Sequence, residues 1–218
     1  MKERAPIVSI VDDDAAARTS LRLLLKSLGL AAVAYDSAAD FLAGHDPQQP
    51  GCHLVDIRMP GMSGLELQQV LNQRGGLTPI IFITGHGDVP MAVEAMQQGA
   101  FDFLQKPFRD QELLDRVQRA IAKDRSLREQ LRSNEDIRRR LESLTGREHD
   151  VLELVAAGSP NKIIAHKLGI SQRTVEIHRA RVMEKMHADS LAQLVHMTMI
   201  TAGAPAARAD RSDEQRPG

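Results

Sequence analysis

LVDIRMPGM, at residues 54–62, is the stretch from which the fold of the first half of the chain can be predicted. An apolar run from Cys52 to Val55 ends in Asp56, and Pro60-Gly61 follows as a turn signal. This pattern is typical of a buried strand that ends in an acid and enters a sharp loop. Ligands of α/β sheets bind beyond the carboxyl ends of the strands. The position of Asp56 therefore indicates a functional carboxylate at the mouth of a sheet.

Further short apolar runs alternate with helical patterns on both sides of this stretch. The expected strands cover residues 6–11, 31–35, 52–56, 79–84 and 101–106. Their apolar residues are continuous rather than alternating, as in strands of a sheet with both faces covered. Strands and helices that alternate at this spacing predict a five-stranded parallel sheet with helices on both faces.

Polar side chains follow the expected strands at one edge of this sheet. Asp12 and Asp13 follow the first strand, Asp56 ends the third, Thr84 ends the fourth and Lys106 ends the fifth. Parallel strands open on one side, so these groups can meet. Clustered carboxylates need a cation, and oxygen ligands of this kind suit Mg²⁺. Since Mg²⁺ and the Lys106 ammonium would neutralise phosphoryl charge, and Thr84 would donate to a phosphoryl oxygen, we expect Asp56 to accept a phosphoryl group.

Each of these residues also has an ordinary explanation when it is taken alone. The acids at residues 12–14 could cap a helix, because carboxylates favour that end. Lys106 could be a surface lysine, and Phe103 could be plain core. The joint occurrence of such groups at four strand ends favours the functional interpretation.

Four motifs together resemble the receiver domain of two-component response regulators of the FixJ type. They are DDD at residues 12–14, DIRMPGMSG from Asp56, ITGHGDVPMAV from Ile83 and KPF from Lys106. The resemblance covers roughly residues 5–125. It implies a flavodoxin-like five-stranded parallel sheet of order 2-1-3-4-5.

The resemblance also implies a magnesium-dependent phosphoacceptor. Asp56 would take the phosphoryl group from a cognate sensor histidine kinase. Asp13 and Asp56, with the backbone carbonyl of Arg58, would bind Mg²⁺, and Asp12 would help through water.

Three more residues of the family's switch have counterparts here. Thr84 and Lys106 would hold the phosphoryl group, and Phe103 falls at the position of the switch aromatic. Lys106-Pro107 corresponds to the family's usual cis peptide. By the same resemblance, phosphorylation would then favour a homodimer, or release the DNA-binding half, or both.

The second half of the chain holds four predicted helices. The first opens with a capping box, Thr145 to Glu148. A short helix at 160–168, a turn at Gly169 and a longer helix at 172–186 are typical of a helix-turn-helix. The longer helix would enter the major groove of double-stranded promoter DNA.

Helical periodicity divides the longer helix into two faces. The predicted inward stripe is Val175, His178, Val182 and Met186. On the opposite face, Ile177 and Ala180 suit a thymine methyl, and Glu176 could accept from a cytosine amine. The DNA-binding set that we predict is Lys162, Gln172, Arg173, Thr174, Glu176, Ile177, His178, Ala180, Arg181 and Lys185.

The segment from about residue 141 to residue 203 resembles the LuxR-type helix-turn-helix. The motifs that carry this resemblance are LTGRE, SPNKIIAHKLGIS, RTVEIHR and MEKM. This resemblance implies an all-α four-helix domain whose fourth helix pairs two DNA-binding domains. Met197 and Ile200 could supply that pairing surface, or they could be ordinary core.

Charge and composition agree with two separate tasks. Residues 1–120 carry 11 Lys/Arg and 15 Asp/Glu, a net of −4, whereas residues 146–202 carry 7 and 6, a net of +1. The single Cys52 excludes an internal disulfide and fits a reducing cytosol. No apolar run approaches the roughly 18 residues of a membrane span, and the start lacks a secretory signal. We therefore expect a cytoplasmic protein that does not enter a membrane.

These patterns predict four segments. Residues 1–122 form the receiver, 123–140 a helical linker, 141–203 the DNA-binding domain and 204–218 a disordered tail. The linker is polar and lacks Pro and Gly, so we expect an exposed helix that could break near Ser133-Asn134. A flexible charged linker is the alternative.

The expected function is a transcription factor, an activator that recruits RNA polymerase once it is phosphorylated. One rival is an aspartyl-phosphate phosphohydrolase, but such enzymes usually carry a second acid two residues after the nucleophile, where this chain has Arg58. A second rival is a DNA-binding protein in which the receiver fold only dimerises. We expect a regulator and not an enzyme.

Overall fold

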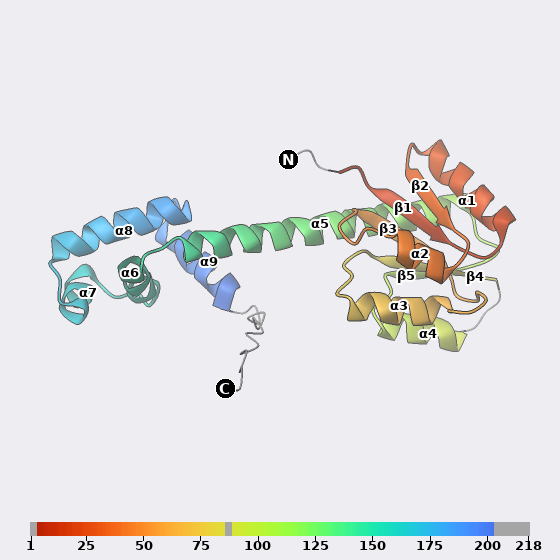
Figure 1. The fold of residues 1–218 in the computed structure, drawn as a ribbon. Helices are drawn as coiled ribbons and strands as arrows, with labels where there is room; N and C mark the ends of the chain where they lie inside the picture. The colour runs from red at the N-terminus through yellow and green to blue at the C-terminus, as the bar shows by residue number, and fades with distance from the viewer. Residues whose placement is uncertain (1–3, 86–88, 203–218) are drawn as a thin grey trace, which may run out of the picture. The chain divides into compact units, whose positions relative to one another are not determined.

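A computed structural model describes residues 4–85 and 89–202 (Figure 1). The chain divides into two compact units between Glu129 and Gln130, inside the segment predicted as the linker. The predicted tail, 204–218, lies outside the described residues, as do His86 to Asp88 of the fourth-strand motif. No helix among the described residues is long and apolar enough to cross a membrane.

The first unit is built on a parallel sheet. Its strands are β1 (Ile7–Val11), β2 (Ala31–Tyr35), β3 (Gly51–Asp56), β4 (Ile80–Thr84) and β5 (Asp102–Gln105). The helices between them are α1 (Ala15–Ser27), α2 (Ala38–Gly44), α3 (Gly64–Gln73) and α4 (Val89–Gln97). All neighbouring strands pair in parallel, and the order is β2-β1-β3-β4-β5. The predicted fold and strand order are therefore confirmed (Figure 1).

Each face of the sheet has its own apolar core. On one face, Leu25 of α1 and Val117 of α5 (Asp110–Glu142) pack against strand residues such as Ile10 and Leu54. On the other face, helices α2, α3 and α4 cover strand residues that include Phe82. Because both faces are covered, the strands are apolar on both sides, as their sequence indicates.

Helix α5 (Asp110–Glu142) continues from the receiver through the segment that was expected to be an exposed helical linker. It passes through Ser133-Asn134 without a break, so the predicted break is wrong. Pairs spaced four residues apart, such as Arg125–Glu129 and Arg138–Glu142, stabilise exposed turns of this helix. With no Pro or Gly in the segment, two poor helix formers do not suffice to end it.

A buried ion pair fastens α5 to the first unit. The Asp124 carboxylate is 1% exposed and accepts from the Gly51 amide at 2.9 Å and from Arg128 Nε at 2.9 Å. Arg128 also donates to Thr78 Oγ1 at 2.9 Å and to the carbonyls of Gln48 and Gln49. These contacts lie before the amino ends of β3 and β4. Part of the predicted linker is thus packed into the first unit.

The second unit contains a bundle of short helices. They are α6 (Gly146–Ala156), α7 (Asn161–Leu168), α8 (Gln172–Met186) and α9 (Leu191–Ala202). Val151, Ile164 and Val182 form its core together with Ile137 from the end of α5. The predicted capping box of Thr145 and Glu148 is present. The predicted four-helix domain is confirmed.

His53 in β3 makes the stability of the first unit sensitive to acid. Its side chain is buried beside Phe41 and His45. Burial, with smaller effects of His45 and Arg128, lowers the pKa of His53 from 6.5 to about 3. Between these pH values, His53 is protonated in the unfolded chain and neutral in the folded chain. The free energy of unfolding therefore falls as pH falls from 6.5 towards 3.

We expect His53→Phe to reduce this acid sensitivity. The slope of unfolding free energy against pH should shrink by up to about 1.4 kcal/mol per pH unit in that window. Hydrogen exchange of the β3 amides, measured across the window, reports the slope for this unit. The exposed His196 in α9 provides the control, as His196→Phe should leave the slope of β3 unchanged. Equal slopes for wild type and His53→Phe would contradict the assignment.

Candidate functional site

Asp56 lies at the carboxyl end of β3 and is 8% exposed. Its Oδ2 accepts from the Arg58 amide at 2.8 Å, and its Oδ1 accepts from Lys106 Nζ at 3.2 Å. Burial raises the pKa of Asp56 above its ordinary value, although the positive charge of Lys106 and the Arg58 amide act in the opposite direction. The carboxylate therefore sits in a partly enclosed position with one cation beside it.

Lys106 joins two carboxylates that come from different strands. Its Nζ donates to Asp12 Oδ2 at 2.9 Å as well as to Asp56. Burial alone lowers the pKa of Lys106, but hydrogen bonding and charge from Asp12 and Asp56 raise it above its ordinary value. The other oxygen of Asp12 accepts from the Asp14 amide at 2.8 Å, which fixes the carboxylate. The strand ends that were expected to meet do meet here.

The remaining predicted residues surround this cluster. Thr84 ends β4 and is buried, and its carbonyl accepts from the Lys106 amide at 2.7 Å. The Asp13 side chain is exposed beside buried Asp12. Phe103 in β5 is half-buried and packs against the core on the α4 face of the sheet. The Lys106-Pro107 peptide is cis, as predicted.

Gly64 is a residue of this region that sequence reasoning missed. It opens α3, and its amide donates to the Ile57 carbonyl at 2.9 Å. A Cβ at this position would lie 2.4 Å from the carbonyl oxygen of Asp56. Only glycine lets α3 start this close to the end of β3, so Gly64 fixes the loop that follows the acid. The sequence feature that could have pointed to Gly64 is its position directly after Ser63, the N-cap residue of α3.

The predicted faces of α8 are present in the second unit. Val175, Val182 and Met186 are buried. The opposite face is exposed, and Ile177 is 47% exposed there. Its exposed members are Arg173, Glu176, Ile177, Ala180 and Arg181, while Gln172 and Lys162 are exposed nearby and Thr174 is half-buried. An apolar residue in a polar exposed stripe suits a surface that is covered by a partner.

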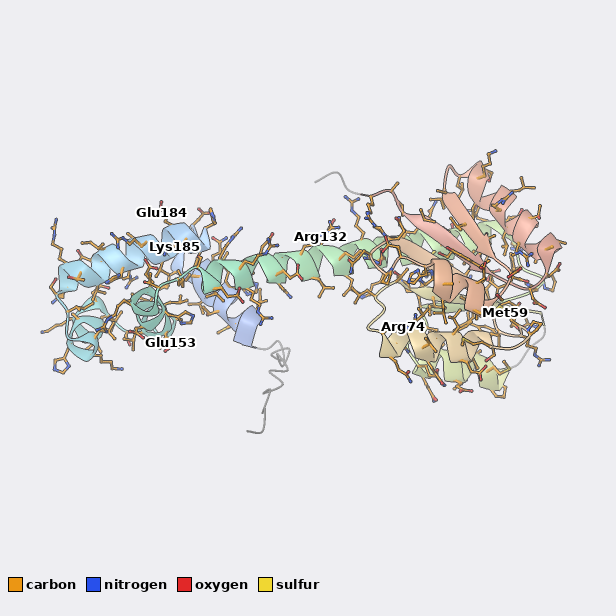
Figure 2. All side chains as sticks on the ribbon, viewed as in Figure 1. Met59, Arg74, Arg132, Glu153, Glu184 and Lys185 are labelled. Atoms are coloured by element: carbon orange, nitrogen blue, oxygen red, sulfur yellow. The ribbon has the colours of Figure 1, made fainter. Side chains whose placement is uncertain are left out.

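Two residues of the predicted DNA-binding set lie elsewhere. His178 is half-buried, and its Nδ1 is enclosed without a hydrogen-bond partner among the described residues. Lys185 projects from the last turn of α8 (Figure 2), and its Nζ donates to Glu148 Oε2 at 2.7 Å and to the Ser143 carbonyl at 3.1 Å. His178 is thus partly enclosed and Lys185 is hydrogen-bonded within the unit, and neither belongs to the exposed stripe.

Comparison with known proteins assigns both units to families. Residues 8–118 match the response regulator receiver domain, and residues 142–198 match the bacterial regulatory proteins of the luxR family. The transcriptional regulatory protein FixJ of Azorhizobium caulinodans is 48% identical over 206 residues, which are 94% of this chain and 97% of that protein. The chain belongs to the FixJ-type response regulators. It is a phosphorylation-controlled transcriptional regulator.

Other relatives of this response regulator agree with that assignment. Nodulation protein W of Bradyrhizobium diazoefficiens is 48% identical over 88% of this chain and 85% of its own. The solved structure of response regulator StyR has a TM-score of 0.83 at 45% identity and covers 89% of this chain and 98% of StyR. Full-length FixJ from B. japonicum has a TM-score of 0.56 at 42% identity over 92% and 98% of the two chains.

The acidic site of this response regulator fits a hard divalent cation. Receiver domains generally bind Mg²⁺ at their phosphorylation site. Here Asp12 and Asp56 both contact one ammonium, so their oxygens lie within reach of a single cation. The described residues contain no group of three or more His, Cys, Asp or Glu side chains that could hold a metal. Mg²⁺ keeps several of its own waters and accepts few protein ligands, so two carboxylates and a carbonyl suffice.

Proposed function

We propose that Asp56 is the phosphoacceptor of this response regulator. The observation that supports it is the Asp12–Lys106–Asp56 cluster, in which a buried carboxylate at a strand end has a shared ammonium beside it. A carboxylate oxygen of Asp56 attacks the phosphorus of the histidine kinase's phosphohistidine. The new O–P bond forms as the P–N bond breaks, and the imidazole leaves with the electron pair of that bond.

The neighbouring residues would balance the charge of the transferred group. Lys106 would contact a phosphoryl oxygen, and the Thr84 hydroxyl would donate to another. Asp13 and Asp56, with the Arg58 carbonyl, would hold Mg²⁺, and Asp12 would act through water. When bound, Mg²⁺ supplies positive charge against the oxygens of the phosphoryl group.

The switch would then run from Thr84 to the surface. Thr84 moves towards the phosphoryl group, and Phe103 repacks. Val93 and Met96 of α4 are about half exposed, and this apolar surface supports our proposal of a homodimer through the α4–β5 region.

The exposed stripe of α8 would read promoter DNA. Ile177 and Ala180 face thymine methyls, and Glu176 accepts from a cytosine amine. Arg173, Thr174 and Lys162 contact phosphates, with Gln172 and Arg181 beside them. We propose that the protein works in the cytoplasm as an activator that contacts RNA polymerase, and that it is a regulator without an enzymatic role. Residues 1–122, 123–140 and 141–203 serve as receiver, linker and DNA-binding domain.

A phosphoryl mimic tests this proposal on the full chain. We expect beryllofluoride with Mg²⁺ to raise affinity for the DNA duplex that the protein selects from a randomised pool by about tenfold, within the usual range of coupling between two sites. Fluorescence anisotropy of labelled duplex measures the affinity, and sedimentation measures self-association. If the mimic changes neither, the coupling between Asp56 and DNA is refuted.

A further inference from the structure

Among the described residues, side-chain hydrogen bonds from Arg179, Arg140 and Lys185 fasten the recognition helix α8 to its own unit. Arg179 Nη1 donates to Asn161 Oδ1 at 2.8 Å, which ties the middle of α8 to the start of α7. Arg140 Nη1 donates to the Met186 carbonyl at 3.1 Å at the end of α8. Lys185 donates to the Ser143 carbonyl and to Glu148 in the first turn of α6. Apolar packing fixes how deep a helix lies, whereas directional contacts such as these fix its rotation and tilt.

Glu148 is buried and positioned to accept this hydrogen bond. It is 2% exposed, and one of its oxygens accepts both from the Thr145 amide at 2.8 Å and from Lys185 Nζ at 2.7 Å. The Lys185 hydrogen bond, followed by the Thr145 amide, lowers the pKa of Glu148 to about 2. The acid is therefore charged throughout the neutral range, and the ion pair persists there.

Lys185 lies off the exposed stripe of α8. At 100° per residue, it is about 120° around the helix from Arg173, about 80° from Ile177 and about 40° beyond Arg181, which is the nearest member of the stripe. Its ammonium has three donors, and two of them are directed to Glu148 and to the Ser143 carbonyl. A DNA phosphate could therefore reach only the one remaining donor of Lys185, unless the ammonium leaves the buried Glu148 carboxylate, to which no second lysine donates among the described residues.

We propose that Lys185 and Glu148 are positioning residues for DNA reading, and that Lys185 acts by orienting α8 rather than by contacting a phosphate. This inference rests on the proposed role of α8. It assigns a DNA-binding effect to Glu148, a residue that is too buried to touch DNA. Two residues 37 positions apart in the chain thereby act together on sequence recognition.

The salt dependence of DNA binding distinguishes positioning from phosphate contact. Each lost phosphate contact reduces the slope of log affinity against log salt by about 0.9, and it weakens binding to all sequences alike. A tilted recognition helix instead loses affinity for its own site and retains the electrostatic binding to any duplex. We therefore compare the duplex selected by the wild-type protein with an unselected duplex over a range of KCl concentrations, using the full chain.

Glu148→Gln is the decisive variant. Glutamine keeps the capping acceptor for the Thr145 amide and removes only the charge, so α6 retains its start. We expect about tenfold weaker binding to the selected duplex, an unchanged salt slope and nearly unchanged binding to the unselected duplex. Lys185→Gln should show the same three results. The double variant should bind the selected duplex no more weakly than either single variant, because both substitutions remove the same interaction.

Arg173→Gln provides the matched reference for a phosphate contact, with a slope smaller by about 0.9 on both duplexes. If Lys185→Gln shows that same loss of slope while Glu148→Gln binds normally, Lys185 is a phosphate ligand and the inference is overturned. Normal binding by both variants overturns it too. If the wild-type protein prefers no duplex, the reading role of α8 itself fails, and that outcome is visible before any variant is made.

Discussion

Asp56→Asn is expected to abolish phosphorylation of the full chain. Asparagine keeps the shape of the side chain but lacks the anionic oxygen that must attack phosphorus. Buried Asp12 is held by Lys106 and by the Asp14 amide, so it offers no equivalent acceptor. Intact-mass analysis after treatment with a small phosphodonor and Mg²⁺ should show one added phosphoryl group on wild type and none on the variant.

Asp14→Asn is the matched control for that experiment. The Asp14 side chain accepts from the Ala16 amide as the N-cap of α1, and asparagine caps as well as aspartate. This variant should be labelled like wild type. Equal labelling of Asp56→Asn would move the phosphoacceptor to another residue and would refute the proposed site.

Among the substitutions considered for the first unit, Arg128→Ala is expected to lower the free energy of unfolding the most. Removing one partner of a buried ion pair typically costs about 3–5 kcal/mol, because the other charge stays buried without compensation. Here the 1%-exposed Asp124 carboxylate would keep the hydrogen bond from the Gly51 amide but lose its cation. The Gln48 and Gln49 carbonyls and the Thr78 hydroxyl would lose the Arg128 donors as well. Hydrogen exchange of the Gly51 amide, followed at increasing urea concentrations, measures the change in the free energy of unfolding.

Arg125→Ala tests whether burial is the cause. Arg125 pairs with Glu129 on the same helix at the same four-residue spacing, but both side chains are more than half exposed. Exposed pairs of this kind contribute only about 0.3–0.5 kcal/mol. If the two alanine variants lost equal stability, helix propensity rather than the buried pair would explain the effect. A double variant with Asp124→Ala should recover part of the loss, since no charge is then left buried.

The sheet and its site could be predicted from the sequence because the functional residues stand directly at the ends of recognisable strand segments. Asp56 and Thr84 each end an apolar run, Lys106 follows β5, and parallel pairing then brings the three to one edge. Gly64 was missed because its constraint comes from the Asp56 carbonyl in a different element, not from its own neighbours.

Contacts between distant segments were the part that sequence could not supply. Asp124 and Arg128 have the spacing of an exposed helix pair, and only the loop before β3 and Thr78 bury them. Lys185 was included in the predicted DNA-binding set because it is a basic residue on the recognition helix. Its partner Glu148 was read only as a capping residue, although it serves both purposes.

Tyr35 is the only tyrosine of the chain, which has no tryptophan. Its ring meets Phe41 edge-on, with centroids 5.3 Å apart, in the first unit. Intrinsic emission at tyrosine wavelengths therefore reports the receiver alone, and the DNA-binding unit is optically silent. A tryptophan placed at Met199, which is 67% exposed on α9, would give that unit a signal of its own, so that one sample could follow both halves separately.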